Sequence, residues 1–531
     1  MTAACHQFQR SFVALACGVL AGVCPPEARS ELIATDIEDL QVRLDATLKY
    51  SLGKRLKGQS AVLTADANQD DGDRAFDKGA LTTSRFDLLA ELDVTYKDLG
   101  LRVSGAGWYD FVYNRGNDYD EFTYNPLSVP VGKFTGATRD LHGRKAEFLD
   151  ALVFGRTNVE EMALTWRLGR HSVLYGESLF YGANGIAAAQ APIDVIKLLS
   201  VPGTQFKELM RPVWQASGQL QLTQRMTFGA YYQFEWEKDR LPAAQSYFSS
   251  TDILDEGGER IFTGPGMWLT RGTDSAAKNS GQYGAQLKYR ASDLDAEFGL
   301  YAAQYHSRSP RVFMDFAKGV YSLFYPESIQ TFGASASTTI LDANVAAEVS
   351  VRDNMPLIPQ AGSVPALGLL PVGKTAHAQV SWVYVMSPSP VWDGGSFVGE
   401  VAYHRVTSVT ANEAMIDSNG TRDAAAVRVL FTPTYHQVLP GLDLSVPIGT
   451  GYGLMGRSVV IPNFAPHHGG DYSVGLAGEY QKLWRFSLTY NGYYGEADGQ
   501  TVPPNSPNPH NSYLQTLRDR NYIVLSVERT L

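Results

Sequence analysis

Hydrophobic and polar residues alternate with a period of two along many segments of this chain. Between Ser84 and Tyr96 the even positions are mainly apolar and the odd positions mainly charged. Successive side chains of a strand point to opposite faces, so this segment predicts a strand with one apolar and one charged face. The same pattern recurs in 42–52, 101–111, 226–236, 283–289, 345–351, 472–480 and 484–494. The chain is therefore predicted to be all-β.

The length of the predicted strands separates two all-β architectures. The longest strands run about ten to thirteen residues, where strands of globular proteins usually run about five or six. A strand that crosses a membrane at a tilt of about 45° needs roughly nine to eleven residues. Aromatic residues also collect at strand ends, as interfacial girdles require: Tyr50, Tyr96, Phe111, Trp236 and Tyr494. Strand length favours a transmembrane antiparallel β-barrel over a soluble sandwich.

The spacing of the strands predicts how they are connected. We predict about eighteen strands, near 42–52, 84–96, 101–111, 147–155, 162–170, 214–223, 226–237, 282–290, 294–305, 330–340, 344–352, 375–385, 397–405, 425–435, 442–447, 472–480, 484–494 and 521–531. Segment 442–447 is the weakest, so sixteen strands remain open. Tight and long gaps alternate along most of the chain, which is typical of a bacterial barrel with short periplasmic turns and long extracellular loops.

The start of the chain is predicted to be a signal peptide, 1–30, followed by one barrel domain, 31–531. Arg10 supplies a positive charge, and Ser11–Val23 is an apolar stretch too short to span a bilayer. Ala28-Arg29-Ser30 then offers small residues at the spacing of a cleavage site. A helical membrane anchor is the alternative.

Composition narrows the classes of function. The cysteines, at positions 5, 17 and 24, all lie in the predicted signal peptide, so the mature chain has no thiol for a disulfide, a metal site or a nucleophile. The formal net charge of −10 argues against nucleic acid as a partner. We expect no cofactor. The expected partners are outer-membrane lipid and lipopolysaccharide, the barrel assembly machinery and a small-molecule substrate, in the outer membrane of a Gram-negative bacterium.

Several short motifs follow one another along most of the mature chain. They are Asp70–Asp73 with Phe76–Gly79, Leu168–Arg170, Gly176–Ser178, Val201–Gly203, Phe206–Glu208, Tyr232–Glu237, Ser246–Ser249 and Asn354–Leu357. Together they resemble DUF1302, a family of Gram-negative outer-membrane proteins of unassigned biochemistry. The resemblance implies an outer-membrane location and, in many genomes, neighbouring genes for the degradation of hydrophobic or aromatic compounds.

The third long loop, 171–213, is less polar than the others. It contains Ile186–Ala189 and then Pro192–Ser200, for which a short helix with Pro192 in its first turn is predicted. Because an apolar loop facing water is costly, we expect this loop to fold into the lumen and narrow it. The charges that would line the constriction and the lumen are Arg85, Asp87, Glu91, Asp93, Arg170, Glu177, Lys197, Lys207, Glu208, Arg211 and Glu235. Alternatively, the loop charges only fasten the loop to the barrel wall.

The acidic segment 66–77 resembles a calcium-binding loop because oxygen ligands alternate along it. Its glycine, Gly72, comes one residue late, and its twelfth position is Asp77 where a bidentate Glu is expected. A solvated turn is therefore the preferred interpretation. His467 and His468 are adjacent and would point to opposite faces of a strand, so we interpret them as loop surface and predict no metal site.

The expected function is passive uptake of small hydrophobic or aromatic compounds by an outer-membrane channel that is not an enzyme. Export of a polyanionic polysaccharide is an alternative, but it needs an electropositive lumen and the inward charges here are mixed. A lipid or ester hydrolase is a third hypothesis. His306, His377 and His404 each have serines nearby, although sequence alone cannot bring Ser, His and an acid together. No catalytic residue is predicted.

Overall fold

The computed structural model describes residues 31–33, 37–201, 203–361, 369–501 and 510–531, so the predicted signal peptide lies outside the described residues. The wall strands are β2 (Leu40–Arg55), β3 (Leu81–Tyr96), β4 (Leu99–Asp110), β5 (Arg144–Val159), β6 (Met162–His171), β7 (Val213–Thr223), β8 (Met226–Gln233), β11 (Gln282–Ala291), β12 (Ala296–Tyr305), β15 (Ile329–Ile340), β16 (Ala343–Pro356), β17 (Val372–Met386), β18 (Gly394–Ala411), β19 (Asp423–Leu439), β20 (Leu442–Ser445), β21 (Ile448–Gly456), β22 (Gly470–Tyr480), β23 (Trp484–Tyr494) and β24 (Tyr522–Thr530). Short helices outside the third loop are α2 (Asp71–Arg74), α3 (Gly136–Thr138), η1 (Arg139–Gly143), η3 (Ser292–Leu294) and η4 (Glu413–Met415). In the described part of the chain, no helix is long and apolar enough to cross a membrane.

The sheet closes on itself through its first and last long strands. Lys49 of β2 lies opposite Asp87 of β3 on one side and opposite Glu528 of β24 on the other. The sheet has 20 strands, but β1 (Glu31–Ile33) is only a short addition beside β2. β20 and β21 both pair with β19 and occupy one wall position, interrupted at Pro447, which cannot donate a ladder hydrogen bond. The result is a closed 18-strand barrel, which confirms the predicted fold and excludes sixteen strands.

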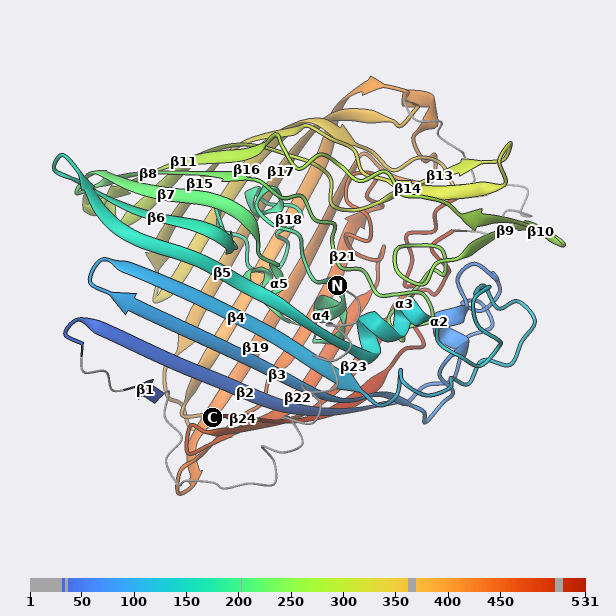
Figure 1. Cartoon of the computed structure of the whole chain (residues 1–531), viewed down its shortest axis with the longest axis horizontal. Coiled ribbons are helices and arrows are strands. Elements are labelled where there is room, and N and C mark those ends of the chain that lie inside the picture. The colour runs from blue at the N-terminus through green and yellow to red at the C-terminus, as the bar shows by residue number, and fades with distance from the viewer. Residues whose placement is uncertain (1–30, 34–36, 202, 362–368, 502–509) are drawn as a thin grey trace.

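Tight turns gather at one end of the barrel and long connections at the other, as Figure 1 shows. The turn between β15 and β16 is formed by Leu341 and Asp342, whose φ angles of 47° and 65° match the positive values of a type I′ hairpin turn. β2 begins and β24 ends at the tight-turn end, because an even number of strands returns the chain to the side from which it started.

Two of the long connections form a second small sheet that the sequence did not predict. β9 (Arg260–Gly264), β10 (Met267–Arg271), β13 (Arg311–Asp315) and β14 (Val320–Phe324) join into a separate four-stranded sheet beyond the barrel wall. Each strand has five residues, too few to show a clear alternation among the flanking turn residues. This sheet covers part of the long-loop end.

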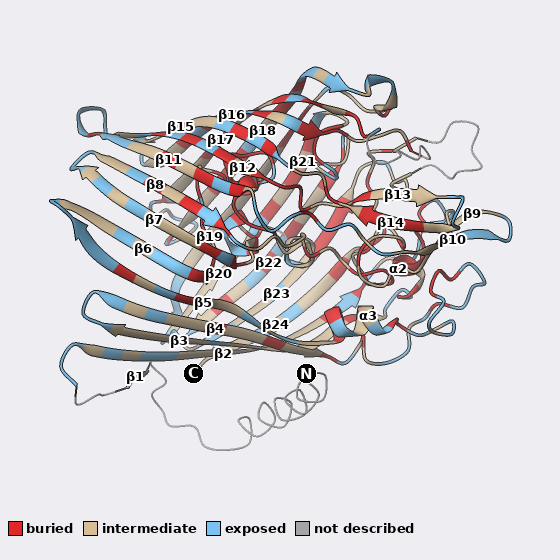
Figure 2. Ribbon diagram, turned by 45° about the horizontal axis from the view of Figure 1, so that its top comes forward, coloured by how far each residue is buried: buried red, intermediate tan, exposed pale blue. Residues whose placement is uncertain are grey.

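Burial follows the alternation of the strands. Phe148, Leu300 and Val349 are 69%, 60% and 56% exposed, whereas Tyr301 and Glu348, which lie next to two of them in sequence, are buried. Apolar side chains therefore point outward to lipid and the alternate positions point inward. Figure 2 shows that buried residues concentrate toward the long-loop end. The buried clusters lie there and around the third loop, where loops and lumen contents pack against the wall.

Candidate functional site

The third loop crosses the barrel interior. We call residues 172–212, between β6 and β7, the constriction loop. It contains η2 (Ile186–Ala189), α4 (Val195–Ser200) and α5 (Phe206–Leu209), and in Figure 1 α4 and α5 lie between the front and rear walls. Its first half reaches β16, β17 and β18, far around the barrel from β6. The expected inward fold of the third loop is confirmed.

Two buried glutamates of the wall bind main-chain N–H groups of this loop. Glu348 accepts hydrogen bonds from the N–H groups of Glu177 (2.7 Å) and Ile186 (2.5 Å). Glu400 accepts from the N–H groups of three successive residues, 179–181, at 2.5–3.3 Å. Bonds to a carboxylate are charge-assisted and stronger than neutral ones. These glutamates fix the loop backbone at two points.

Two buried arginines bind carbonyl groups of the same segment. Arg352 donates from one guanidinium nitrogen to the carbonyls of residues 183–185 at 2.8–3.0 Å. Arg308 donates to the carbonyls of Ala188 (3.0 Å) and Ala189 (3.4 Å). A loop without regular structure must satisfy its buried backbone groups through side chains. Four side chains satisfy the backbone of this loop, and we call them the four anchors: Glu348, Glu400, Arg308 and Arg352. Their two negative and two positive formal charges cancel.

Asn184 of the loop lies between two histidines of the wall. Its Oδ1 is 3.1 Å from Nδ1 of both His377 and His404, and His404 Nε2 is 2.8 Å from Ser458 Oγ. Although this line resembles a hydrolase triad, all four residues are buried, and Ser458 Oγ also accepts the N–H groups of residues 460–461. The arrangement therefore braces the constriction loop against the wall through Asn184.

Half-exposed charges line a different part of the interior. Arg102 of β4 pairs with Glu91 and lies 3.6 Å from Asp93 and 3.7 Å from Asp150. These side chains lie on the inward face, opposite the exposed Leu101 and Val153 of the same strands. With Arg85 and Asp87 they form what we call the charged wall, on β3, β4 and β5. Its side chains remain partly accessible to water inside the barrel.

The part of the charged wall near the start of β3, Arg85 and Asp87, is linked to the constriction loop. Arg85 pairs with Asp87 at 2.5 Å, and its guanidinium lies 4.5 Å from the centre of the Trp108 ring. Arg240, from the loop after β8, lies 5.6 Å from the same ring and binds Asp194 at 2.9 Å. Asp194 is the residue that caps α4. Of the predicted lumen residues of β3, Arg85 and Asp87 therefore lie near the constriction loop.

Other predicted residues form a network at the rim. Arg170 lies 3.4 Å from Glu235 and 3.2 Å from Glu237, and Arg211 lies 3.1 Å from Glu237. Arg170 shares its strand face with the exposed Leu168, so its side chain starts from the outer face of β6. The network fastens both ends of the constriction loop to the segment after β8, beside the constriction and not within it.

Glu177, another predicted residue of the loop, forms an ion pair with β11 of the barrel wall. Its carboxylate lies 3.6 Å from Nζ of Lys288, which also binds Glu297 at 2.6 Å. Burial raises the pKa of Glu177, although Lys288 acts in the opposite direction. Glu177 therefore exchanges protons at a higher pH than an exposed glutamate.

The remaining predicted charges lie on the two helices of the constriction loop. Lys197 of α4 donates to the main-chain carbonyl of Glu208 in α5 at 3.0 Å, and both side chains are exposed. Lys207 is exposed as well. These charges face water within the barrel and connect the helices only weakly.

The four anchors and Arg102 were not predicted from the sequence. Glu348 and Arg352 lie on the polar face of the alternating segment 345–351 and its extension, so their inward orientation was visible in the pattern. Nothing in the pattern distinguished a charge that binds a loop from one that faces water.

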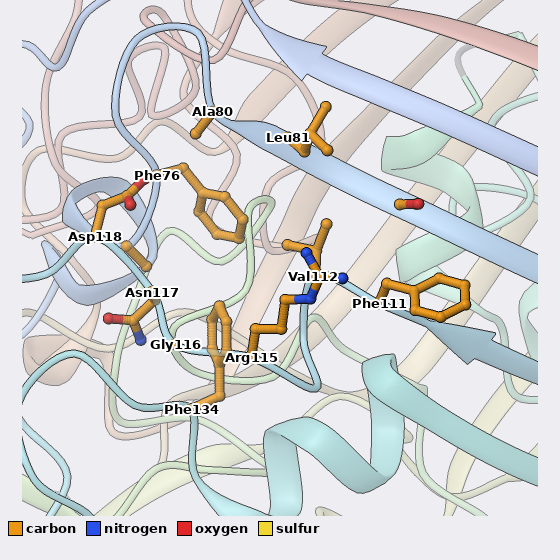
Figure 3. Close-up of a pocket in the computed structure, with 12 residues that line it drawn as sticks. Phe76, Ala80, Leu81, Phe111, Val112, Arg115, Gly116, Asn117, Asp118 and Phe134 are labelled. Carbon is orange, nitrogen blue, oxygen red and sulfur yellow. The ribbon is translucent and has the colours of Figure 1, made fainter.

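A cavity of about 320 Å³ opens at the long-loop end, where β3 begins and β4 ends. The buried rings of Phe76 and Phe134 pack against each other at its border, with their centres 6.0 Å apart. Leu81, Phe111 and Arg115 are the exposed side chains around it (Figure 3). The volume lies within the range of small-molecule pockets. The cavity combines apolar side chains with the guanidinium of Arg115 and the carboxylate of Asp118.

The model of the family described as protein of unknown function, DUF1302, matches residues 11–531, so the chain belongs to this family. No curated protein matches the sequence significantly. Solved structures with a similar course of the chain include OpdK of Pseudomonas aeruginosa with vanillate (12% identity, TM-score 0.38, covering 92% of this chain and 98% of that chain). OccAB4 of Acinetobacter baumannii (10%, 0.41, 92% and 98%) and the outer-membrane channel DcaP of the same organism (11%, 0.36, 93% and 97%) are others. The barrel itself is established by its own strand pairing.

Proposed function

We propose that this member of the DUF1302 family is an outer-membrane channel through which small hydrophobic or aromatic molecules diffuse passively into the cell. The observation that carries this proposal is the constriction loop, held inside a closed barrel by four buried charged anchors. A loop fixed in this way narrows the lumen to a constant size, and the charged wall faces the passage that remains. The even strand number favours long loops on the outer surface and both barrel ends of the chain in the periplasm.

The cavity at the long-loop end supports the proposed class of substrate. The exposed side chains of Leu81 and Phe111 offer apolar surface on which an aromatic molecule can pack. Arg115 adds a cation that favours a carboxylate on the same molecule. A small aromatic acid matches both features, whereas a sugar matches neither.

Export of a polyanionic polysaccharide fits the lumen less well. In the charged wall Arg102 is surrounded by three carboxylates, those of Glu91, Asp93 and Asp150. A polyanion would meet excess negative charge along this surface. The channel hypothesis is therefore favoured over export.

The constriction is tested by removing residues 186–200, which carry η2 and α4. The single-channel conductance in a planar bilayer should rise, because the segment that fills the lumen is gone. The Lys207→Ala variant, which changes an exposed residue of the same loop, should keep the conductance of the wild type. An unchanged conductance in the deletion variant would contradict a constricting loop.

The substrate class is tested by liposome swelling with benzoate, cyclohexanecarboxylate and glucose at equal concentration. We expect benzoate to enter fastest and glucose slowest. Arg115→Ala, a change of an exposed residue, should reduce the rates for benzoate and cyclohexanecarboxylate but not the rate for glucose, since it removes the cation that favours a carboxylate. Equal rates for all three solutes would refute selectivity for aromatic or hydrophobic molecules.

A further inference from the structure

Three buried carboxylates meet among the long loops. Asp70 and Asp71 come from the loop between β2 and β3, and Asp252 comes from the loop between β8 and β11. One oxygen of each lies within 4.8 Å of the other two, and all three residues are at most 1% exposed. The interpretation of 66–77 as a solvated turn is therefore wrong, because other loops pack over its acidic residues.

Three separate loops are joined at this carboxylate cluster. The N–H of Asp71 donates to Asp252 Oδ2 at 3.1 Å, and the N–H of Asn125, from the loop between β4 and β5, lies 3.3 Å from both carboxylate oxygens of Asp71. Gly72 packs so tightly that a Cβ atom there would lie 2.7 Å from the carbonyl oxygen of Ser246. A glycine at position 72 therefore allows the loop between β2 and β3 to pack closely against the loop between β8 and β11.

The negative charge of the cluster is only partly neutralised. Arg74 pairs with Asp70 at 2.6 Å. Within the described ranges no ion pair reaches Asp71 or Asp252. An ionised carboxylate that is buried without a counter-charge is strongly unfavourable. Asp71 and Asp252 therefore require either a bound proton or a bound cation.

Two oxygen atoms beside the cluster lack hydrogen-bond partners. Asp252 Oδ1 and Asn125 Oδ1 are both buried and receive no hydrogen bond from the part of the chain that the structure describes. Buried polar atoms normally have a partner, so an unpartnered oxygen next to two uncompensated carboxylates points to a missing positive group.

We propose that Asp71 and Asp252, together with Asp70, bind a calcium ion that fastens three long loops to one another. Oxygen ligands suit a hard cation, and calcium accepts irregular coordination by carboxylate, amide and carbonyl oxygens. Magnesium is less suited because it keeps several waters in strict octahedral geometry, and this cluster is closed to solvent.

The test uses the full folded protein in detergent, first stripped with EDTA and then titrated with terbium. Tyr119 is a built-in sensitiser, since its hydroxyl lies 3.5 Å from both oxygens of Asp70. Excitation of tyrosine should produce terbium emission that calcium displaces. Asp71→Asn and Asp252→Asn should each weaken terbium binding by at least about tenfold. Asp120→Asn, an exposed change next to Tyr119, should leave it intact.

Melting of the wild type in calcium and in EDTA is a second measurement that needs no variant. Calcium should raise the melting temperature of the wild type and of Asp120→Asn, but not that of Asp252→Asn. Circular dichroism verifies that each variant keeps its strand content. Absence of terbium emission, together with equal melting in calcium and EDTA, overturns the proposal. Asn variants that gain equal stability in both solutions also overturn it, because they would indicate a shared proton.

Discussion

The anchors of the constriction loop and the residues of the charged wall are the same kinds of side chain in different surroundings. The four anchors, Glu348, Glu400, Arg308 and Arg352, are at most 6% exposed and bind main-chain groups. The side chains of the charged wall are 25–38% exposed and pair with one another. Both sets lie inside one barrel, on inward-facing strand positions except for Arg308, which lies in the loop after β12.

This difference in solvation separates two roles for charge. Removing one member of a buried, hydrogen-bonded set leaves its partners without water or a substitute, which costs several kcal/mol. Removing one member of a half-exposed pair costs about 1 kcal/mol or less, because water replaces the lost partner. We infer that the anchors determine where the constriction loop lies, whereas the charged wall determines which ions and solutes pass it.

The largest effect is expected from Glu400→Ala. Three successive N–H groups lose their acceptor, so the free energy of unfolding should fall by about 3–5 kcal/mol, and single-channel recordings should show a larger and unsteady conductance. Glu400→Gln is the matched control, because its amide oxygen still accepts hydrogen bonds. A quiet channel of normal conductance in the Ala variant would show that Glu400 does not fix the loop.

A smaller loss is expected from Arg352→Met, which keeps the length of the side chain but removes the donor to three carbonyls. Stability should fall by about 1–3 kcal/mol, with more frequent fluctuations of the open current. Arg290→Met, at an exposed position of β11, should change neither property. Equal behaviour of the two variants would contradict the distinction between anchor and surface arginine.

Substitutions in the charged wall should change the ion selectivity of the channel and hardly change the free energy of unfolding. Arg102→Gln leaves Glu91, Asp93 and Asp150 without their cation, so the channel should favour cations more strongly in a potassium chloride gradient. Asp93→Asn should shift the reversal potential in the opposite direction. Stability should change by about 1 kcal/mol or less in both. If Arg102→Gln unfolds the protein, the two sets of charge do not differ as described.

The smallest effect is expected from pH. Because burial raises the pKa of Glu177, acidification neutralises it at a higher pH than an exposed glutamate, while Lys288 remains charged. Selectivity should then shift toward anions as the pH falls. At neutral pH the Glu177→Gln variant should already have the ion selectivity that the wild type shows at low pH. Its reversal potential should no longer change with pH through this group. A Gln variant that titrates like the wild type would assign the change to another group.

The sequence predicted the wall of the barrel much better than its contents. A strand records its two faces in adjacent residues, so period two revealed nearly every wall strand, and even the weak segment 442–447 became β20. The constriction depends on pairs such as Ile186 and Glu348, separated by 162 residues, and no local pattern records such a pair. The prediction of a solvated turn at 66–77 was wrong for the same reason. Asp252 and Asn125, which bury Asp71, come from other loops, and their positions cannot be deduced from the local sequence.

The seam between β2 and β24 has a consequence for assembly. Its two strands come from opposite ends of the chain, with Thr47 paired to Thr530. The constriction loop is made early, but Glu400, which binds it, follows more than two hundred residues later. Contacts between residues so distant in sequence form slowly. The interior must therefore be arranged while the wall is still open, and a chain that lacks its last strand would keep both edges unpaired and its lumen accessible from the side.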